Sequence, residues 1–278
     1  MKFCKPWLRV MPTYGMLIPG EKETKINFTI EVNNEIASAL NSGKDILEDI
    51  IILRLENGRD YYITIRGRYG RSCFGMSLDE LVMYNDPIRS VPLDPVKRIE
   101  KYGSDQAAVL CVPKELWRIV DAIYEKGLNA RDLFSISGYV EETQRIRECL
   151  DTGEAFGDFR IHSMADVLVT FLSSLSATVV PPNLLPGLEV DAQNIQGHAR
   201  SFLEGLPPIH YNVFVYIISF FRECLVFHPS NQLTAVKLAR ICVRCLVTGN
   251  EVEESRQANQ RQKSMLVLMV HFLESSLI

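Results

Sequence analysis

The sequence predicts a multidomain protein, in which a partial immunoglobulin-like β-sandwich is followed by an all-α domain. Up to residue 75, short runs of alternating apolar and polar residues are bounded by turn residues, a pattern typical of strands. From residue 112 onward, apolar residues recur every three or four positions, which is typical of helices. Residues 76–111 contain three X-Pro pairs that disfavour helix, so we expect a connector there.

In the β part, residues 1–75, three strands are clear. Residues 22–32 alternate apolar and polar side chains, and residues 49–55 and 60–66 form a second and a third apolar run. Asn57 and Gly58 separate these two runs and tolerate the positive φ angles that a tight hairpin needs. An immunoglobulin-like sandwich needs about seven strands, and only four or five are visible here. We therefore expect an N-terminally incomplete domain.

In the α part, residues 112–278, Pro113 suits the first turn of a helix. The helix that follows places one apolar stripe along its length: Leu116, Ile119, Val120 and Ile123. Proline-rich breaks separate the later helices, which we expect at 140–150, 163–175, 191–203, 211–227, 233–246 and 256–277. An all-α domain of this length lies within the usual single-domain range.

Composition narrows the classes of function. A net charge of −4 argues against a general nucleic-acid binder, and no apolar run is long enough to insert directly into a membrane. Cys242 and Cys245 have zinc-like spacing but share one helix without a second ligand pair, so core packing is favoured over a metal site. His162 and His210 stand at helix starts and are interpreted as capping or packing residues. No metal and no cofactor are predicted.

Residues 133–153, LFSISGYVEETQRIRECLDTG, resemble the signature of Rho-family GTPase-activating domains. Two later motifs follow in the family's order, the helix beginning at His162 and the start Leu206-Pro207-x-x-His210-x-Asn212. The resemblance covers residues 112–277 and implies the RhoGAP helical fold. In that family an arginine at the position of Ser135 contacts the transferring phosphoryl group.

Ser135 has neither the charge nor the reach of an arginine. Three more family polar residues are replaced, the lysine by Val169, an arginine by Ser173 and an asparagine by Lys237. We therefore expect no catalytic residue here and an inactive domain. The alternative is an active GTPase-activating protein that uses a non-standard arginine such as Arg131. It is disfavoured because catalytic geometry tolerates only about half an ångström of misplacement.

The N-terminal part resembles the ASH domain of the type II inositol polyphosphate 5-phosphatase family. Matching segments begin at Cys4, as Cys4-Lys5-Pro6-Trp7-Leu8-Arg9, and at Ser72, as Ser72-Cys73-Phe74-Gly75. The match continues into the helical part through Val112-Pro113-Lys114-Glu115-Leu116-Trp117. Nothing in the chain resembles the family's phosphatase domain. A fragment of a longer phosphoinositide 5-phosphatase is therefore a further alternative.

The second resemblance also implies partners. Rab GTPases are expected to bind the ASH part through Phe74, an aromatic in a glycine-flanked turn that is either tucked inward or offered to a partner. Endosomal adaptors with a phenylalanine-histidine motif are expected to bind Trp117, which lies beside the apolar stripe as a rim residue or an anchor. Rac and Cdc42 are expected to bind weakly. These partners imply a cytoplasmic protein recruited to endosomes and Golgi membranes.

Overall fold

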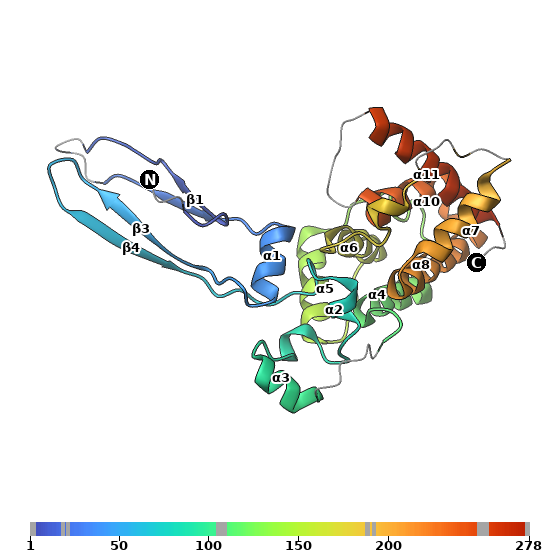
Figure 1. Cartoon of the computed structure of the whole chain (residues 1–278), viewed down its shortest axis with the longest axis horizontal. Helices are drawn as coiled ribbons and strands as arrows, with labels where there is room; N and C mark the ends of the chain where they lie inside the picture. Colours follow the sequence, from blue (N-terminus) through green and yellow to red (C-terminus); the bar gives the residue numbers. More distant parts are fainter. Residues whose placement is uncertain are drawn as a thin grey trace. The chain divides into compact units, whose positions relative to one another are not determined.

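The chain folds into a β-rich unit, Met1–Arg71, and a helical unit, Ser72–Ile278 (Figure 1). The computed structural model describes residues 4–17, 20, 23–103, 110–186, 190, 193–248 and 256–275. The predicted order of a β part followed by an α part is confirmed.

The β unit contains two separate antiparallel pairs of strands in the part of the chain that is described. Strand β1, Leu8–Met11, pairs with β2, Asn27–Ile30, and β3, Glu48–Arg54, pairs with β4, Asp60–Arg66. Their shared core is small, and its buried members are Trp7, Leu8, Leu40 and Leu47. Phe28 and Ile30 lie opposite the inward residues of β1 yet stay 38% and 43% exposed. The sandwich is therefore partial, as predicted.

Two local features of the β unit differ from expectation. A helix, α1 (Asn34–Asn41), follows β2, and the Asn33 side chain caps it by accepting a hydrogen bond of 2.9 Å from the Ile36 amide. Pairing of β3 with β4 ends at Arg54 and Asp60, so the hairpin loop runs over residues 55–59 and is longer than the tight turn expected at Asn57 and Gly58. Only Asn57 of the predicted Asn-Gly pair takes a positive φ, 59°.

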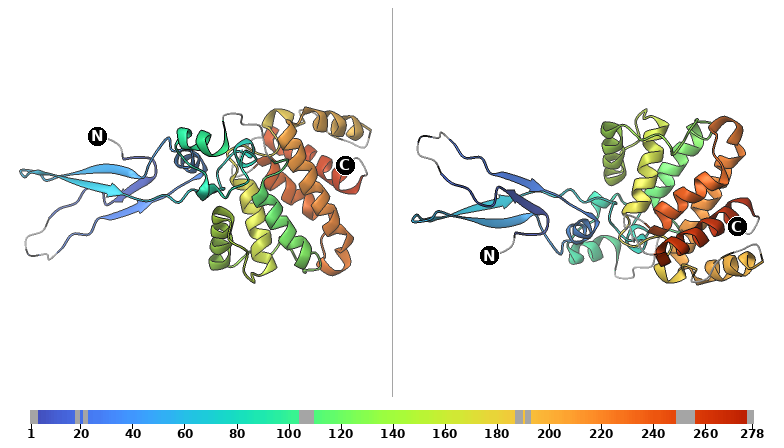
Figure 2. Two further views of the ribbon diagram at one scale, coloured as in Figure 1. Left: turned by 90° about the horizontal axis from the view of Figure 1, so that it is seen from below. Right: turned by 90° about the horizontal axis from the view of Figure 1, so that it is seen from above.

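All seven helices expected beyond residue 112 are present in the described part of the helical unit, and their described ends shift by up to four residues (Figures 1 and 2). Residues 191–192 and 276–277 of the expected helices lie outside the described residues. They are α4 (Lys114–Lys126), α5 (Val140–Thr152), α6 (Ile161–Ser174), α7 (Ile195–Gly205), α8 (Pro208–Val226), α10 (Ala235–Cys242) and α11 (Arg256–Glu274). Helix α10 continues as a π-helical segment, η3 (Val243–Thr248). Short elements complete the unit: α2 (Leu78–Leu81), η1 (Ile88–Ser90), α3 (Pro95–Tyr102), η2 (Pro182–Leu184) and α9 (His228–Asn231).

Helix α8 runs through the centre of the helical core. By length and composition alone it could cross a membrane, but seven of its residues are buried among the neighbouring helices. Phe214 of α8 meets the ring of Phe202 from α7 at 5.1 Å and that of Phe272 from α11 at 5.3 Å. These close ring contacts make α8 a core helix of the folded unit.

The expected connector, residues 76–111, is largely part of the helical unit. Met76, Leu78, Leu81 and Ile88 are buried in the helical core. A capping box starts α2, because Ser77 and Glu80 each bind the backbone amide of the other. Pro87 precedes η1 and Pro95 begins α3, positions at which proline is compatible with a helix. The helical unit therefore begins at Ser72.

Candidate functional site

The loop between α4 and α5 keeps an unusual backbone around Ser135. Asp132 and Phe134 have φ angles of 54° and 69°, a region that non-glycine residues occupy only when their surroundings impose it. The Ser135 amide donates to the Asp132 carbonyl over 2.9 Å, and the Ser135 side chain is exposed. A serine therefore stands at the tip of a well-defined turn.

Asn231, at the end of α9, holds this turn in place. Its side-chain amide donates to the carbonyls of Leu128, at 2.8 Å, and Cys224, at 2.7 Å, while its side-chain oxygen accepts from the Leu233 amide at 2.9 Å. The Asn231 carbonyl accepts from the Asp132 amide at 3.1 Å. Asn231 is completely buried, so each of these bonds is shielded from water. The sequence analysis missed this residue, and an isolated asparagine carries no local signal of such a role.

The ring of Phe134 anchors the same turn from the other side. It lies edge-on to Phe221 of α8, with ring centroids 5.4 Å apart. Gly138 follows, and its amide donates to Asp166 over 3.0 Å. A Cβ atom at Gly138 would come within 2.8 Å of the Ser163 Cα, so only glycine fits this approach. The loop is thus fixed at both ends.

Arg131 and Lys237 are both engaged by groups close to them in the sequence. The Nε atom of Arg131 lies 3.5 Å from the Asp132 carboxylate, and the Lys237 ammonium donates to the Gln232 carbonyl over 3.0 Å. The Arg131 guanidinium therefore lies beside its sequence neighbour Asp132. Val169 is buried in α6, and Ser173 is partly buried.

The residues that follow Ser135 expose apolar side chains. Ile136, Tyr139 and Val140 are each at least half exposed. The Arg160 guanidinium covers one face of the Tyr139 ring at 3.8 Å, and the Tyr139 amide donates to Ser163 at 3.2 Å. We call Ile136, Tyr139 and Val140 the finger-loop surface. Such a patch is suited to contact with a protein.

Trp117 lies on an exposed face of α4, beside the buried stripe, as predicted. Its side chain is 51% exposed, and Tyr124, two turns later on the same face, is equally exposed. Asp121 lies between them along the helix. Burial, with a smaller contribution from the Asp121 charge, raises the pKa of Tyr216 on α8 to about 12. We call Trp117, Asp121 and Tyr124 the α4 aromatic face.

Phe74 is not offered to a partner in this structure, which corrects the expected orientation. The side chain is only 4% exposed, and its ring meets Phe171 of α6 edge-on at 5.5 Å. The Arg147 guanidinium covers the ring at 4.2 Å and is itself exposed. The physical reason is the apolar area of the ring, which is removed from water within the helical unit. The tucked-in alternative therefore describes its position.

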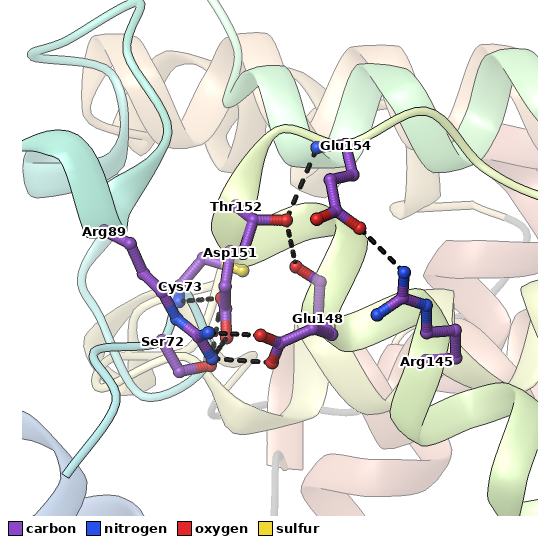
Figure 3. A network of polar contacts seen from close by, with 8 residues as sticks. All are labelled: Ser72, Cys73, Arg89, Arg145, Glu148, Asp151, Thr152 and Glu154. Atoms are coloured by element: carbon purple, nitrogen blue, oxygen red, sulfur yellow. Dashed lines mark hydrogen bonds and ion pairs between the residues drawn. The ribbon is translucent and has the colours of Figure 1, made fainter. Parts of the chain in front are cut away.

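A polar network holds the Phe74 segment against α5 (Figure 3). Asp151 accepts from the Cys73 amide at 2.8 Å and from the Ser72 hydroxyl at 3.1 Å. Arg89 donates to Glu148 at 2.7 Å and lies 3.7 Å from Asp151. Burial raises the pKa of the Asp151 carboxyl above its ordinary value, and the hydrogen bonds from Cys73 and Ser72 oppose this shift.

The described residues bring together no group of three or more potential metal ligands. Cys242 and Cys245 are completely buried, and burial raises the pKa of Cys245 to about 12. Both thiols therefore stay protonated at neutral pH and pack in the core. His210 Nδ1 lies 2.7 Å from the Val179 carbonyl, and His162 Nε2 lies 3.0 Å from that of Arg131.

Comparison with known families matches both units. The RhoGAP domain matches residues 113–251, and the ASH domain described as inositol polyphosphate 5-phosphatase OCRL-like matches residues 1–69. The mouse type II inositol 1,4,5-trisphosphate 5-phosphatase is 34% identical over 86% of this chain and 25% of its own length. Mouse Rho GTPase-activating protein 24 is 23% identical over 81% of this chain and 27% of its own length.

Among solved structures, human Rho GTPase activating protein 15 is similar, with a TM-score of 0.54 and 16% identity. The alignment covers 74% of this chain and 93% of that protein's chain. At this identity the likeness establishes the fold. The chain spans about a quarter of the length of the curated relatives it matches.

Proposed function

Because the chain belongs to the RhoGAP domain family and carries that domain beside an OCRL-like ASH domain, we propose that it is a catalytically inactive interaction module. The observation that carries the proposal is the turn at Ser135. Its strained backbone and its anchors on Asn231 and Phe221 are kept, while a serine stands at the tip. The RhoGAP fold is kept, and a serine stands at the position where the family carries its arginine.

The missing cation matters because phosphoryl transfer depends on stabilising charge in the transition state. An arginine finger contributes on the order of a thousand- to a hundred-thousand-fold in rate. A serine hydroxyl cannot replace it. Arg131, four positions before Ser135, pairs with Asp132, and Lys237 donates to the Gln232 carbonyl. This favours inactivity over an alternative arginine.

Single-turnover GTP hydrolysis by Rac and by Cdc42 tests the proposal. The unmodified chain is expected to leave the hydrolysis rate essentially unchanged, and Ser135→Arg to restore little, because Val169, Ser173 and Lys237 also depart from the family. Arg131→Ala is the matched variant for the alternative. Stimulation by about a hundredfold, lost in Arg131→Ala, would establish an active enzyme and overturn the proposal.

We further propose that the α4 aromatic face binds phenylalanine-histidine adaptor peptides. Trp117 and Tyr124 offer exposed aromatic surface to the phenylalanine, and Asp121 offers a carboxylate to the histidine. Trp117→Ala is expected to weaken a fluorescent peptide about thirtyfold, equivalent to about 2 kcal/mol. Asp121→Asn should weaken it less and remove the gain in affinity below the histidine pKa. Tyr14→Ala, an exposed tyrosine of the β unit, is the control, and equal loss in that variant would contradict the assignment.

Rab binding at the Phe74 segment, which lies in the helical unit directly after the ASH match, is proposed on the family resemblance. Since the Phe74 ring is buried, the exposed side chain that covers it, Arg147, is the more direct candidate for contact. Arg147→Glu should lower the affinity for a GTP-loaded Rab without lowering stability. Phe74→Val should lower both. If only Phe74→Val weakens Rab binding, Arg147 is not a contact.

Weak binding of Rac or Cdc42 would use the finger-loop surface, whose apolar side chains need no arginine finger. Recruitment from the cytoplasm to endosomes and Golgi membranes would then follow from these partners and can be tested with a fluorescent fusion carrying Trp117→Ala. A phosphatase activity would belong to a longer protein, since this chain matches a quarter of the mouse 5-phosphatase.

A further inference from the structure

One face of the β3–β4 hairpin exposes apolar side chains. Residues directly opposite each other on paired strands point to the same side. The inner side carries Ile51 and Ile65, which pack on the core of the β unit. On the opposite side Ile50 and Tyr62 are 56% and 69% exposed. We call this opposite side the hairpin outer face; its four cross-strand pairs are Glu48 with Arg66, Ile50 with Thr64, Ile52 with Tyr62, and Arg54 with Asp60.

Charged pairs close both ends of this face. Glu48 accepts from Arg66 Nη2 at 2.9 Å and from Arg66 Nε at 3.1 Å. At the other end Arg54 Nε lies 3.8 Å from an Asp60 carboxylate oxygen. The acid stands on β3 at one end and on β4 at the other. The four corners of the face therefore alternate in sign, with apolar side chains between them and no net charge.

This arrangement is complementary to itself. If a second copy is turned about a two-fold axis across the strands, Glu48 meets Arg54 of the second copy and Arg66 meets its Asp60. If the axis runs along the strands, Glu48 meets Arg66 of the second copy and Arg54 meets its Asp60. Both arrangements bring opposite charges together and stack the apolar centres, as a symmetric contact between identical surfaces requires.

We propose that the hairpin outer face is a self-association surface through which two copies of the chain pair face to face. An apolar centre with a charged rim has the composition of a protein interface. Two strands bury little area, so the dimer belongs to the weak class of contacts below about 1,200 Å². A different protein would fit this face only if it carried the same alternation of four charges. A second copy of the chain carries that alternation because its surface is identical.

Sedimentation equilibrium of the full chain over a wide concentration range tests the proposal. The unmodified chain should associate reversibly to a dimer. Tyr62→Glu places an unpaired carboxylate in the apolar centre and should weaken the dimer at least about tenfold, the effect of about 1.4 kcal/mol. Tyr14→Glu, at a tyrosine 91% exposed elsewhere in the β unit, should leave it unchanged. Far-UV circular dichroism verifies that both variants are folded.

Exchanging the charges of paired residues on the hairpin outer face distinguishes loss of the dimer contact from a general loss of folding stability. A variant that combines Glu48→Arg and Arg66→Glu exchanges the two charges and keeps the ion pair within each chain. With the axis across the strands, this variant should not dimerise until Arg54→Asp and Asp60→Arg are added. With the axis along the strands, it should dimerise with itself and not with the unmodified chain. A monomer at all concentrations, or a dimer indifferent to Tyr62→Glu and to the exchanges, overturns the proposal. Loss of Rab binding in Tyr62→Glu without any dimer would assign the face to a GTPase instead.

Discussion

The β unit and the helical unit of this chain differ in how completely they bury their apolar residues. The buried core of the β unit consists of Trp7, Leu8, Leu40 and Leu47, and β2 leaves Phe28 and Ile30 in contact with water. The helical core runs through α4, α5, α6, α8, α10 and α11. Because burial of apolar area is the main stabilising contribution, the helical unit should hold most of the stability. In the β unit, apolar residues of the same types remain exposed on the surface.

Paired phenylalanine substitutions give the largest expected contrast between the units. Phe214→Ala removes a completely buried ring and should lower the free energy of unfolding by about 3–5 kcal/mol. Phe28→Ala, on the partly exposed face of β2, should cost about 0.5 kcal/mol or less. Urea denaturation followed by circular dichroism measures the loss in Phe214→Ala. Hydrogen exchange at β3 measures the loss in Phe28→Ala. Similar losses would mean that the β unit is better packed than its exposure indicates.

Asn231→Ala should give the next largest effect. The substitution removes the side-chain partner of the Leu128 carbonyl and of the Leu233 amide, while the Cys224 carbonyl keeps its bond from the Phe227 amide. Each unsatisfied buried group costs about 1–3 kcal/mol, so a total of about 3 kcal/mol is expected. Thr234→Ala, which removes the exposed cap of α10, is a control with a cost of about 1 kcal/mol. If Asn231→Ala costs no more than the control, water replaces the lost bonds.

Hydrogen exchange in the unmodified chain should separate the two units. Amides of Ile51–Leu53 in β3 should exchange at least about a hundredfold faster than those of Ile217–Phe221 in α8, a difference of about 2.7 kcal/mol in opening free energy. The β unit should also melt first on heating. One cooperative transition with equal protection in β3 and α8 would remove the distinction between the units.

The smallest expected effect is the pH dependence due to Asp151. Burial raises its pKa in the folded protein, so the folded state binds this proton more tightly than the unfolded state does. Stability from this group should therefore fall as pH rises from the ordinary carboxyl pKa of 3.8 through the raised value. Asp151→Asn should remove that slope and still accept from Cys73. The free energy of unfolding is measured by denaturation between about pH 3 and 7, the range of carboxyl titration. If its slope against pH is the same in Asp151→Asn, other groups cause the slope.

Local patterns predicted the elements, and long-range packing explains what they missed. The alternation in β3 and β4 and the stripe on α4 follow from short periodicities, and Ser135 follows from its motif. Phe74 was misplaced because its contact, Phe171, lies almost a hundred residues away. The Asn231 bond to Leu128 spans 103 positions. Residues 76–111 were taken for a connector because the prolines are visible locally and the core that receives Leu78 and Ile88 is not.

The left-handed residues Asp132 and Phe134 have a consequence for binding kinetics. A loop whose shape is set by Asn231 and by the Phe221 ring does not have to be ordered when a partner arrives. The entropy of fixing about ten residues, roughly 1–2 kcal/mol each, is spent when the chain folds. A GTPase meeting Ile136 and Tyr139 would then associate in one step, at a rate set by collision and orientation. Differences in affinity at this surface would then arise mainly from the dissociation rate of the complex.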